Sequence, residues 1–113
     1  MRQTICIVSL LVSALWVGTA AQAGNVALGK AKSEEAACVS CHGADGVKGL
    51  DASYPILAGQ HPDFIARALT DYKTGRRKNA VMSGMAAALS KQDIENLAAY
   101  YASLPGPLGV IKR

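Results

Sequence analysis

Apolar residues recur at helical spacing in three segments of the chain, and no segment alternates convincingly like a half-buried strand. The pattern predicts helices over residues 26–37, 62–74 and 90–104, and therefore an all-α fold. The second segment buries one face, made of Phe64, Ile65, Ala68, Leu69 and Tyr72. The third has the stripe Ile94, Leu97, Ala98, Tyr101 and Leu104. The first has a looser face of Val26, Leu28, Gly29, Lys32, Ala36 and Ala37.

Capping residues mark the ends of these helices. Asn25 is a suitable N-cap for the first helix, and Pro62 suits the first turn of the second. Gly75 is the expected residue just beyond the second helix, where a left-handed backbone is common. Ser90, with Asp93 three residues later, predicts a variant capping box at the start of the third helix.

Glycine and proline interrupt the pattern between the helices. We expect a loop over residues 43–60 and a second loop over residues 76–89, and the sequence Pro105-Gly106-Pro107 should end the third helix. Eighteen residues without regular structure are unusual in a small domain unless the loop has a function. Wrapping around a bound cofactor is such a function.

The first 23 residues have the organisation of a secretory signal. Arg2 precedes the apolar run Ile5–Ala20, and Ala21-Gln22-Ala23 provides a small-residue cleavage site. A retained transmembrane anchor is the alternative, but the run is shorter than the roughly 20 residues that span a bilayer. We therefore expect cleavage after Ala23, export to the periplasm, and one domain over residues 24–113.

The predicted mature domain offers little material for a hydrophobic core. It contains one Phe, four Tyr and no Trp, and much of its apolar content is alanine. A domain of this size is marginally stable unless something reinforces it. Its two cysteines lie three positions apart, and a disulfide between them would close only a tiny loop. The composition therefore favours a large apolar cofactor as part of the core.

Charge argues against one class of partner. Without the signal, the chain would hold eleven basic residues against eight acidic ones, a formal charge of +3. No basic run exceeds three residues, and no aromatic residues are interleaved with the basic ones. The pattern therefore does not indicate binding to nucleic acid.

The sequence Cys38-Val39-Ser40-Cys41-His42 is the C-x-x-C-H pattern to which c-type haem is attached. Thiols at this spacing can add to the two vinyl groups on one edge of a porphyrin. His42 then lies beneath the iron and supplies an axial imidazole. We expect Cys38 and Cys41 to hold one haem c covalently and His42 to be an iron ligand. The predicted export signal favours this interpretation, because attachment follows export.

Three other interpretations of the motif compete with haem. A zinc site needs about two further Cys or His ligands, and the predicted mature chain offers only His61 outside the motif. A thioredoxin-type redox pair expects a βαβ context, whereas this chain is predicted to be all-α. A structural disulfide beside an incidental histidine is the third.

The iron also needs a sixth ligand or an open position. His61, Met82 and Met85 are the candidates in residues 24–113. A Met/His pair raises the reduction potential and suits electron transfer. At least one methionine must be core filler, a common role for this flexible side chain. His61 precedes Pro62 at a helix start, where exposure is the expectation.

Several ordered motifs resemble those of class I bacterial cytochromes c, especially the small periplasmic type whose domain also occurs in tandem in dihaem cytochromes. They are the segment Cys38–Gly46, the segment Tyr54–Gln60 (YPILAGQ), Met82-x-Gly84, and the segment Leu89–Tyr101. The resemblance covers residues 24–104. It implies three main helices wrapped around one covalently attached haem, with the first and third crossing near a right angle.

The resemblance also implies roles for individual residues. Gly29 would let Tyr100 or Tyr101 pack closely against the first helix. The Pro55 carbonyl would accept a hydrogen bond from the His42 imidazole and so fix the ring. Met82 occupies the place of the family's axial sulfur, with Met85 as the alternative.

The walls of the haem pocket follow from the helical pattern. We expect them to be formed by Leu57, Phe64, Ile65, Leu69, Tyr72, Leu89, Leu97 and Tyr101. An apolar wall disfavours the extra charge of ferric iron and keeps the reduction potential high. Tyr72 either reaches a haem propionate or is an ordinary half-buried tyrosine.

The basic run Arg76-Arg77-Lys78 is a solvated loop, a propionate partner, or a surface that steers an acidic protein toward the haem.

Three functions are compatible with the sequence. The first is a diffusible one-electron carrier without catalytic residues. Its donor could be a membrane cytochrome complex or a dehydrogenase flavoprotein, and its acceptor a terminal oxidase or a reaction centre. The second is the electron-accepting haem subunit of a dehydrogenase, such as a flavocytochrome c sulfide dehydrogenase. The third is a haem enzyme or gas sensor with an open iron position, which requires that neither methionine binds the iron.

Overall fold

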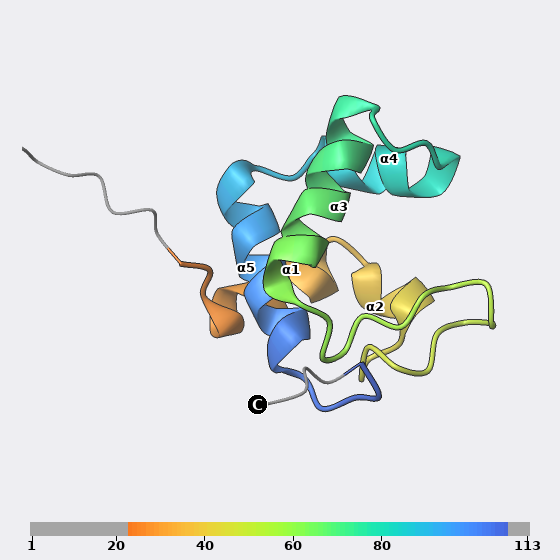
Figure 1. Ribbon diagram of the computed structural model, residues 1–113, viewed down its shortest axis with the longest axis vertical. Coiled ribbons are helices and arrows are strands. Elements are labelled where there is room, and N and C mark those ends of the chain that lie inside the picture. Colours follow the sequence, from red (N-terminus) through yellow and green to blue (C-terminus); the bar gives the residue numbers. More distant parts are fainter. Residues whose placement is uncertain (1–22, 109–113) are drawn as a thin grey trace, which may run out of the picture.

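The computed structural model describes residues 23–108, and every regular element in that range is a helix (Figure 1). The helices are α1 (Val26–Glu35), α2 (Cys38–His42), α3 (Pro62–Thr74), α4 (Ala80–Ala87) and α5 (Lys91–Ser103). The predicted all-α fold is confirmed. None of the described helices is long and apolar enough to cross a membrane. The predicted signal peptide, apart from Ala23, lies outside the described residues and stays a prediction.

The predicted capping interactions are present. The Asn25 side chain accepts a hydrogen bond from the backbone N–H of Leu28 at the start of α1. Gly75 ends α3 with a left-handed backbone at φ 77°. Ser90 and Asp93 form both hydrogen bonds of the capping box that begins α5. These local signals explain why the boundaries of α3 and α5 follow the sequence closely.

The first helix differs from its prediction. It ends at Glu35 rather than Ala37, because Ala37 has a left-handed backbone (φ 56°) that separates α1 from the short helix α2. The expected apolar face is also wrong in part. Val26 and Leu28 are exposed, whereas Gly29 and Ser33 are buried. The face of α1 that points into the protein carries small residues, because the helix lies very close to α5.

The predicted loop over residues 76–89 is wrong, because most of it forms α4. The Asn79 side chain caps this helix by accepting a hydrogen bond from the backbone N–H of Met82, at 3.0 Å. Three of the eight residues of α4 are alanine, the strongest helix former. Alanine and the asparagine cap therefore outweigh Gly84, which favoured a loop.

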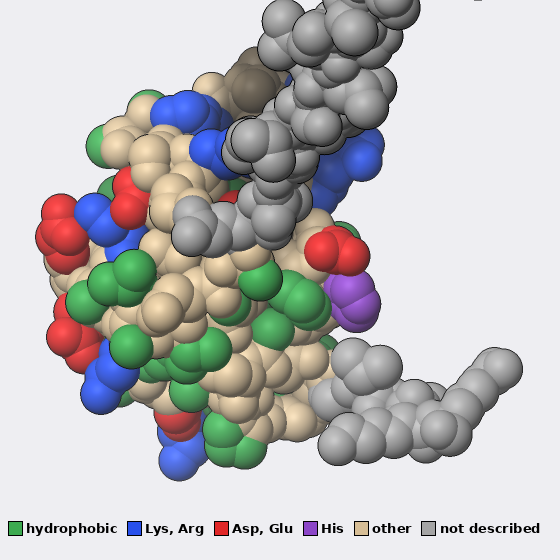
Figure 2. Space-filling view, turned by 90° about the vertical axis from the view of Figure 1, so that its left-hand side faces the viewer, with side chains coloured by type: hydrophobic (Ala, Val, Ile, Leu, Met, Phe, Trp, Pro, Cys, Tyr) green, Lys and Arg blue, Asp and Glu red, His purple; other side chains and the backbone are tan. Residues whose placement is uncertain are grey.

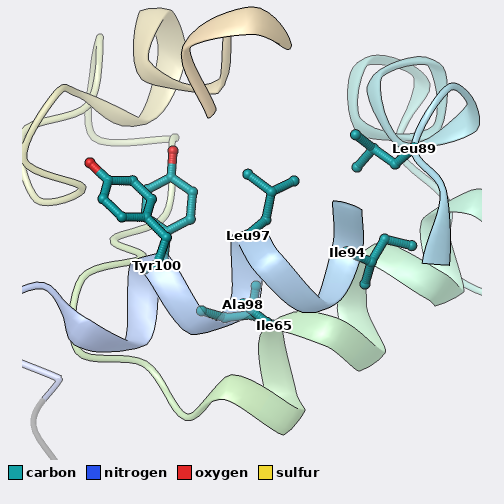
Figure 3. Packing of buried hydrophobic residues seen from close by; sticks show 7 residues of the cluster. Ile65, Leu89, Ile94, Leu97, Ala98 and Tyr100 are labelled. Carbon is teal, nitrogen blue, oxygen red and sulfur yellow. The ribbon is translucent and has the colours of Figure 1, made fainter. Parts of the chain in front are cut away.

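The core is centred on α5, which packs against α1 on one side and α3 on the other. Figure 3 shows buried side chains of α5 together with Ile65 of α3 and Leu89 of the α4–α5 connection. The cluster contains Ile65, Leu89, Ile94, Leu97, Ala98, Tyr100 and Tyr101. Large side chains are few, as the composition predicted.

Gly29 makes the contact between α1 and α5 possible. A Cβ atom at this position would collide with the backbone of Asn96 and lie 2.7 Å from the Cβ of Tyr100. The expected close packing is therefore confirmed for Tyr100, and it includes the backbone of α5 as well. The buried Asn96 adds a hydrogen bond from the Asn25 N–H to its side-chain oxygen, at 2.8 Å.

The segment between α2 and α3 has no helix or strand, as predicted, but hydrogen bonds fix its path. The Asp45 side chain accepts from the N–H groups of Val47 and Lys48, each at 2.9 Å. The Gly46 carbonyl accepts from the N–H of Leu57 at 2.8 Å, and the Gly59 N–H donates to the carbonyl of Tyr101 at 3.0 Å. The loop therefore returns to the end of α5 and carries Pro55 back past α2.

We predict that Gly29→Ala lowers the free energy of unfolding by about 3 kcal/mol, the upper end of the cost of overpacking. The neighbouring atoms belong to backbone and to a Cβ, so they cannot rotate away. The control is Gly84→Ala, because no heavy atom outside the local helix lies within 4 Å of a Cβ there. That variant should be unchanged or up to about 1 kcal/mol more stable. Denaturant unfolding followed by circular dichroism distinguishes them, and equal effects would contradict the packing at Gly29.

Asp93 predicts a pH dependence of stability. The hydrogen bond from the Ser90 N–H is the main cause that lowers the pKa of this carboxyl, and Lys32 adds to the shift. A lowered pKa in the folded state stabilises the protein above the ordinary carboxyl pKa of about 4, and this contribution is lost as the pH falls through the folded value. Asp93→Asn should therefore lose less stability than wild type on acidification. Asp63 has a side chain that is 94% exposed, and Asp63→Asn should lose as much stability as wild type. Denaturant unfolding at several pH values measures these losses, and a larger loss in Asp93→Asn than in wild type would exclude this role of Asp93.

Candidate haem site

Two adjoining cavities lie between α2, α3, α4 and α5. Their volumes are about 330 and 290 Å³. They share five lining residues: Cys38, His42, Pro55, Tyr72 and Met82. The cavities are thus two halves of one site, and the residues between them come from α2, the following loop, α3 and α4.

Helix α2 brings Cys38, Cys41 and His42 to the site in a single turn. Both cysteines are partly buried, and only 6% of the His42 surface is exposed. The left-handed backbone at Ala37 reorients the chain at the end of α1, so that α2 starts in a new direction. Because α1 is fixed against α5 through Gly29, the position of α2 depends on that helix contact.

The imidazole of His42 is held in one orientation. Its Nδ1 lies 2.9 Å from the carbonyl oxygen of Pro55, to which it donates. The ring of Tyr54 meets it edge-on, with centroids 6.2 Å apart and an angle of 88°. The hydrogen bond expected from the resemblance is therefore present. It assigns the proton to Nδ1 and leaves Nε2 free to coordinate a metal.

The thiols do not have the properties of a zinc site or a redox pair. Cys38 and Cys41 are free, with no disulfide between them. Burial raises the pKa of the Cys38 thiol. Within residues 23–108, no three His, Cys, Asp or Glu side chains cluster as a metal site. A neutral thiol beside an apolar cavity suits thioether attachment better.

Helix α4 places the two methionines differently. Met82 is half-buried and lines both cavities, whereas Met85 is 36% exposed and lines only the second. The side chain of Asn79 binds the N–H of Met82 itself. His61, the other ligand candidate, has a side chain that is 56% exposed at the start of α3 and is not a lining residue.

The cavity wall agrees with the expected set except at one position. Seven of the expected wall residues line the first cavity: Leu57, Phe64, Ile65, Leu69, Tyr72, Leu97 and Tyr101. Leu89 was expected there and is not a lining residue, because it is buried in the core beside α5. Ile56, Gln60 and Ala68 also line this cavity and were not predicted from the sequence. Ala68 could have been found, since it shares the apolar face of α3.

The three side chains of the basic run Arg76-Arg77-Lys78 lie in different surroundings. Arg77 lines the first cavity, and its guanidinium carbon lies 4.9 Å from the centre of the Tyr72 ring. Arg76 is 3.9 Å from the carboxylate of Asp71, and Lys78 is exposed. Arg77 is the one Lys or Arg that lines either cavity within the described part of the chain.

The surface shows a mixture of charges elsewhere. On the face in Figure 2, acidic and basic side chains are interspersed around the rim, and hydrophobic side chains gather nearer the middle. This face has no continuous field of one sign. The arrangement agrees with the sequence argument against nucleic-acid binding.

Comparison with known proteins identifies the chemistry of the site. The sequence profile of a family described as cytochrome c matches residues 26–105, which include the complete C-x-x-C-H motif. The chain belongs to the cytochrome c family. Haem c is therefore its covalently bound cofactor, and the motif fits the attachment of one such group.

Individual relatives agree with this assignment. The cytochrome is 39% identical over 104 residues to a cytochrome c4 from Pseudomonas aeruginosa, across 92% of this chain and 50% of that protein. It is 43% identical to cytochrome c-554(548) from Halomonas halodenitrificans, across 72% of this chain and 98% of that protein. It is 46% identical to a thiosulfate dehydrogenase electron acceptor from Thiomonas intermedia, across 63% of this chain and 33% of that protein. The chain thus spans about half the length of the cytochrome c4 it matches.

The fold agrees as well. Reduced recombinant cytochrome c4 from Pseudomonas stutzeri superposes with a TM-score of 0.61 at 34% identity, covering 74% of this chain and 53% of that one. The expected class I cytochrome c fold is therefore confirmed.

The residues present fit haem c. The exposed atoms of both cavities are mainly apolar, which suits a porphyrin. A nitrogen donor and a sulfur donor, from His42 and Met82, lie among the residues common to both. The cysteines that would form the thioethers also line the site, Cys38 in both cavities and Cys41 in the second.

Proposed function

We propose that this cytochrome is a periplasmic one-electron carrier with His42 and Met82 as the axial ligands of its haem iron and with thioethers at Cys38 and Cys41. The observation that carries the proposal is that His42, Cys38 and Met82, from two separate helices, line the same two cavities. When bound, haem c supplies an iron that alternates between the ferrous and ferric states.

The choice of Met82 over Met85 rests on burial and restraint. Met82 lines both cavities, and its backbone N–H is bound by the cap of α4. The more exposed Met85 lines one cavity only. A neutral thioether opposite an imidazole favours ferrous iron and raises the reduction potential.

The protein contributes a rigid imidazole and an apolar surrounding. The hydrogen bond from Nδ1 to the Pro55 carbonyl increases the basicity of His42 and fixes its ring. The apolar wall lowers the local dielectric, which disfavours the additional charge of ferric iron. Oxidation and reduction then require little rearrangement of this chain. We propose no catalytic residue.

A second candidate function uses the same site in another setting. The Thiomonas relative is named as an electron acceptor of thiosulfate dehydrogenase. This cytochrome would then be the electron-accepting subunit of a dehydrogenase. A stable partner that co-elutes from gel filtration after gentle purification supports this function, and a single species of about 10 kDa supports a free carrier.

Export to the periplasm is proposed from the sequence. The charge, apolar run and small-residue site of residues 1–23 support it. N-terminal sequencing of the native protein should begin at Gly24, and a chain that retains Met1 would contradict cleavage.

We predict that Met82→Ala abolishes the far-red charge-transfer band of the ferric protein, because that band reports the bond between methionine sulfur and iron. The variant should also bind cyanide or carbon monoxide rapidly, since the sixth position opens. Met85→Ala is the matched control and should keep the band. If wild type already binds these ligands rapidly and lacks the band, the haem has an open position and a sensor or enzyme replaces the carrier. Loss of the band in Met85→Ala alone would reverse the assignment.

We also predict that Arg77, rather than Arg76, pairs with a haem carboxylate. A guanidinium beside a carboxylate lowers its pKa by about 1 unit or more. Arg77→Gln should therefore raise the pH at which the reduction potential begins to fall by about 1 unit, whereas Arg76→Gln should not, because Arg76 lies beside Asp71. Potentiometric titration over pH tests this.

Identical pH profiles in all three proteins would place Arg77 among solvated or partner-steering charges. If Arg77 steers a partner, the rate of reaction with an acidic redox protein should fall with salt and in Arg77→Glu, whereas a solvated Arg77 predicts no change in the variant.

A further inference from the structure

The C-terminal end of α4 is bound by a lysine from a different helix. Lys73 lies in the last turn of α3. Its Nζ donates to the carbonyl oxygens of Ala87 at 2.9 Å and Leu89 at 2.6 Å. The last carbonyl groups of a helix have no partner within the helix, and a cation there also suits the helix dipole. Lys73 therefore caps α4 from outside and joins it to α3, the neighbouring helix in Figure 1.

Helix α4 has few buried side chains that hold it against the rest of the protein. It is eight residues long, which is too short for a helix to be stable on its own. Ala86 is its one buried residue. The Asn79 side chain holds its first turn, and Lys73 holds its end. One capping side chain at each terminus therefore adds to the packing of α4 against α3.

Lys73 is separate from the haem site itself. It is not a lining residue of either cavity, and its ammonium group forms no ion pair with a carboxylate in the described part of the chain. Its hydrogen bonds go to backbone oxygens on either side of Ala88. The hydrogen bonds of Lys73 therefore connect it to the haem site through α4.

We propose that Lys73 is a positioning residue that keeps α4, and with it the sulfur of Met82, in register with the haem iron. The proposal rests on Met82 being the axial ligand. Without the ammonium group, the end of α4 loses its hydrogen bonds to α3 and keeps the packing around Ala86 and the connection to α5. The helix can then move away from α3, and Met82 leaves the iron more often.

The experiment measures how easily imidazole replaces the methionine. The ferric holoprotein is titrated with imidazole, and loss of the far-red band reports displacement of sulfur. Lys73→Met keeps the length of the side chain and removes the donors. It should bind imidazole about tenfold more tightly, the effect expected from losing about 1.4 kcal/mol of restraint.

Two further variants serve as controls. Lys78→Met makes the same change of charge at an exposed lysine for which the described structure shows no hydrogen bond, and it should match wild type. Lys73→Arg retains a cation with several donors and should restore most of the wild-type affinity. If Lys73→Met does not accumulate as holoprotein, Lys73→Gln keeps one donor group and should give an intermediate increase.

The outcomes separate this proposal from the proposed function. Equal imidazole affinities in wild type, Lys73→Met and Lys78→Met overturn the positioning role while Met82 ligation stands. A lower free energy of unfolding in Lys73→Met with unchanged imidazole affinity also overturns it, because a purely structural role predicts that result. Absence of the far-red band in wild type overturns Met82 ligation and the positioning role together.

Discussion

The apolar space between α2, α3, α4 and α5 is the feature on which the rest of the structure depends. The chain has too few large side chains to fill it, and the core around α5 is built from a small number of residues and several alanines. A haem attached at Cys38 and Cys41, as proposed, would fill this space and add the apolar surface that the composition lacks. The cofactor is thus part of the core as well as the redox centre.

The positions of His42 and Met82 depend on contacts both at the cavities and away from them. Gly29 allows α1 to lie against α5, and α1 leads directly into α2 with His42. The loop after α2 is fixed to the end of α5 and brings the Pro55 carbonyl to the imidazole. On the other side, Asn79 and Lys73 hold α4. The part of the site with His42 is held by the packing of α1 on α5 and by the loop after α2. The part with Met82 belongs to a short helix that is capped at both ends.

Much of the fold and most of the site could be predicted from the sequence. The boundaries of α3 and α5 follow from local signals, and the C-x-x-C-H motif specifies three site residues without knowledge of the fold. The hydrogen bond to Pro55 was expected from the resemblance to class I cytochromes c and is present.

The errors have physical causes. Helix α4 was missed because Gly84 and the absence of a clear apolar stripe concealed an alanine-rich helix with an asparagine cap. Leu89 lies in the core rather than the cavity wall, because its direction is set by the α4–α5 connection. The break at Ala37 could not be found, since alanine rarely adopts a left-handed backbone. The hydrogen bonds of Lys73 could not be predicted, because its partners are carbonyl groups fourteen and sixteen residues away.

The central claim is that the haem iron is held between His42 and Met82. Proton NMR of the reduced holoprotein tests it most directly, because the ring current of a diamagnetic haem shifts the methyl signal of a bound methionine far upfield. One such signal is predicted in wild type and in Met85→Leu, and none in Met82→Leu. Its absence from wild type, or its loss on replacing Met85 alone, would contradict the claim.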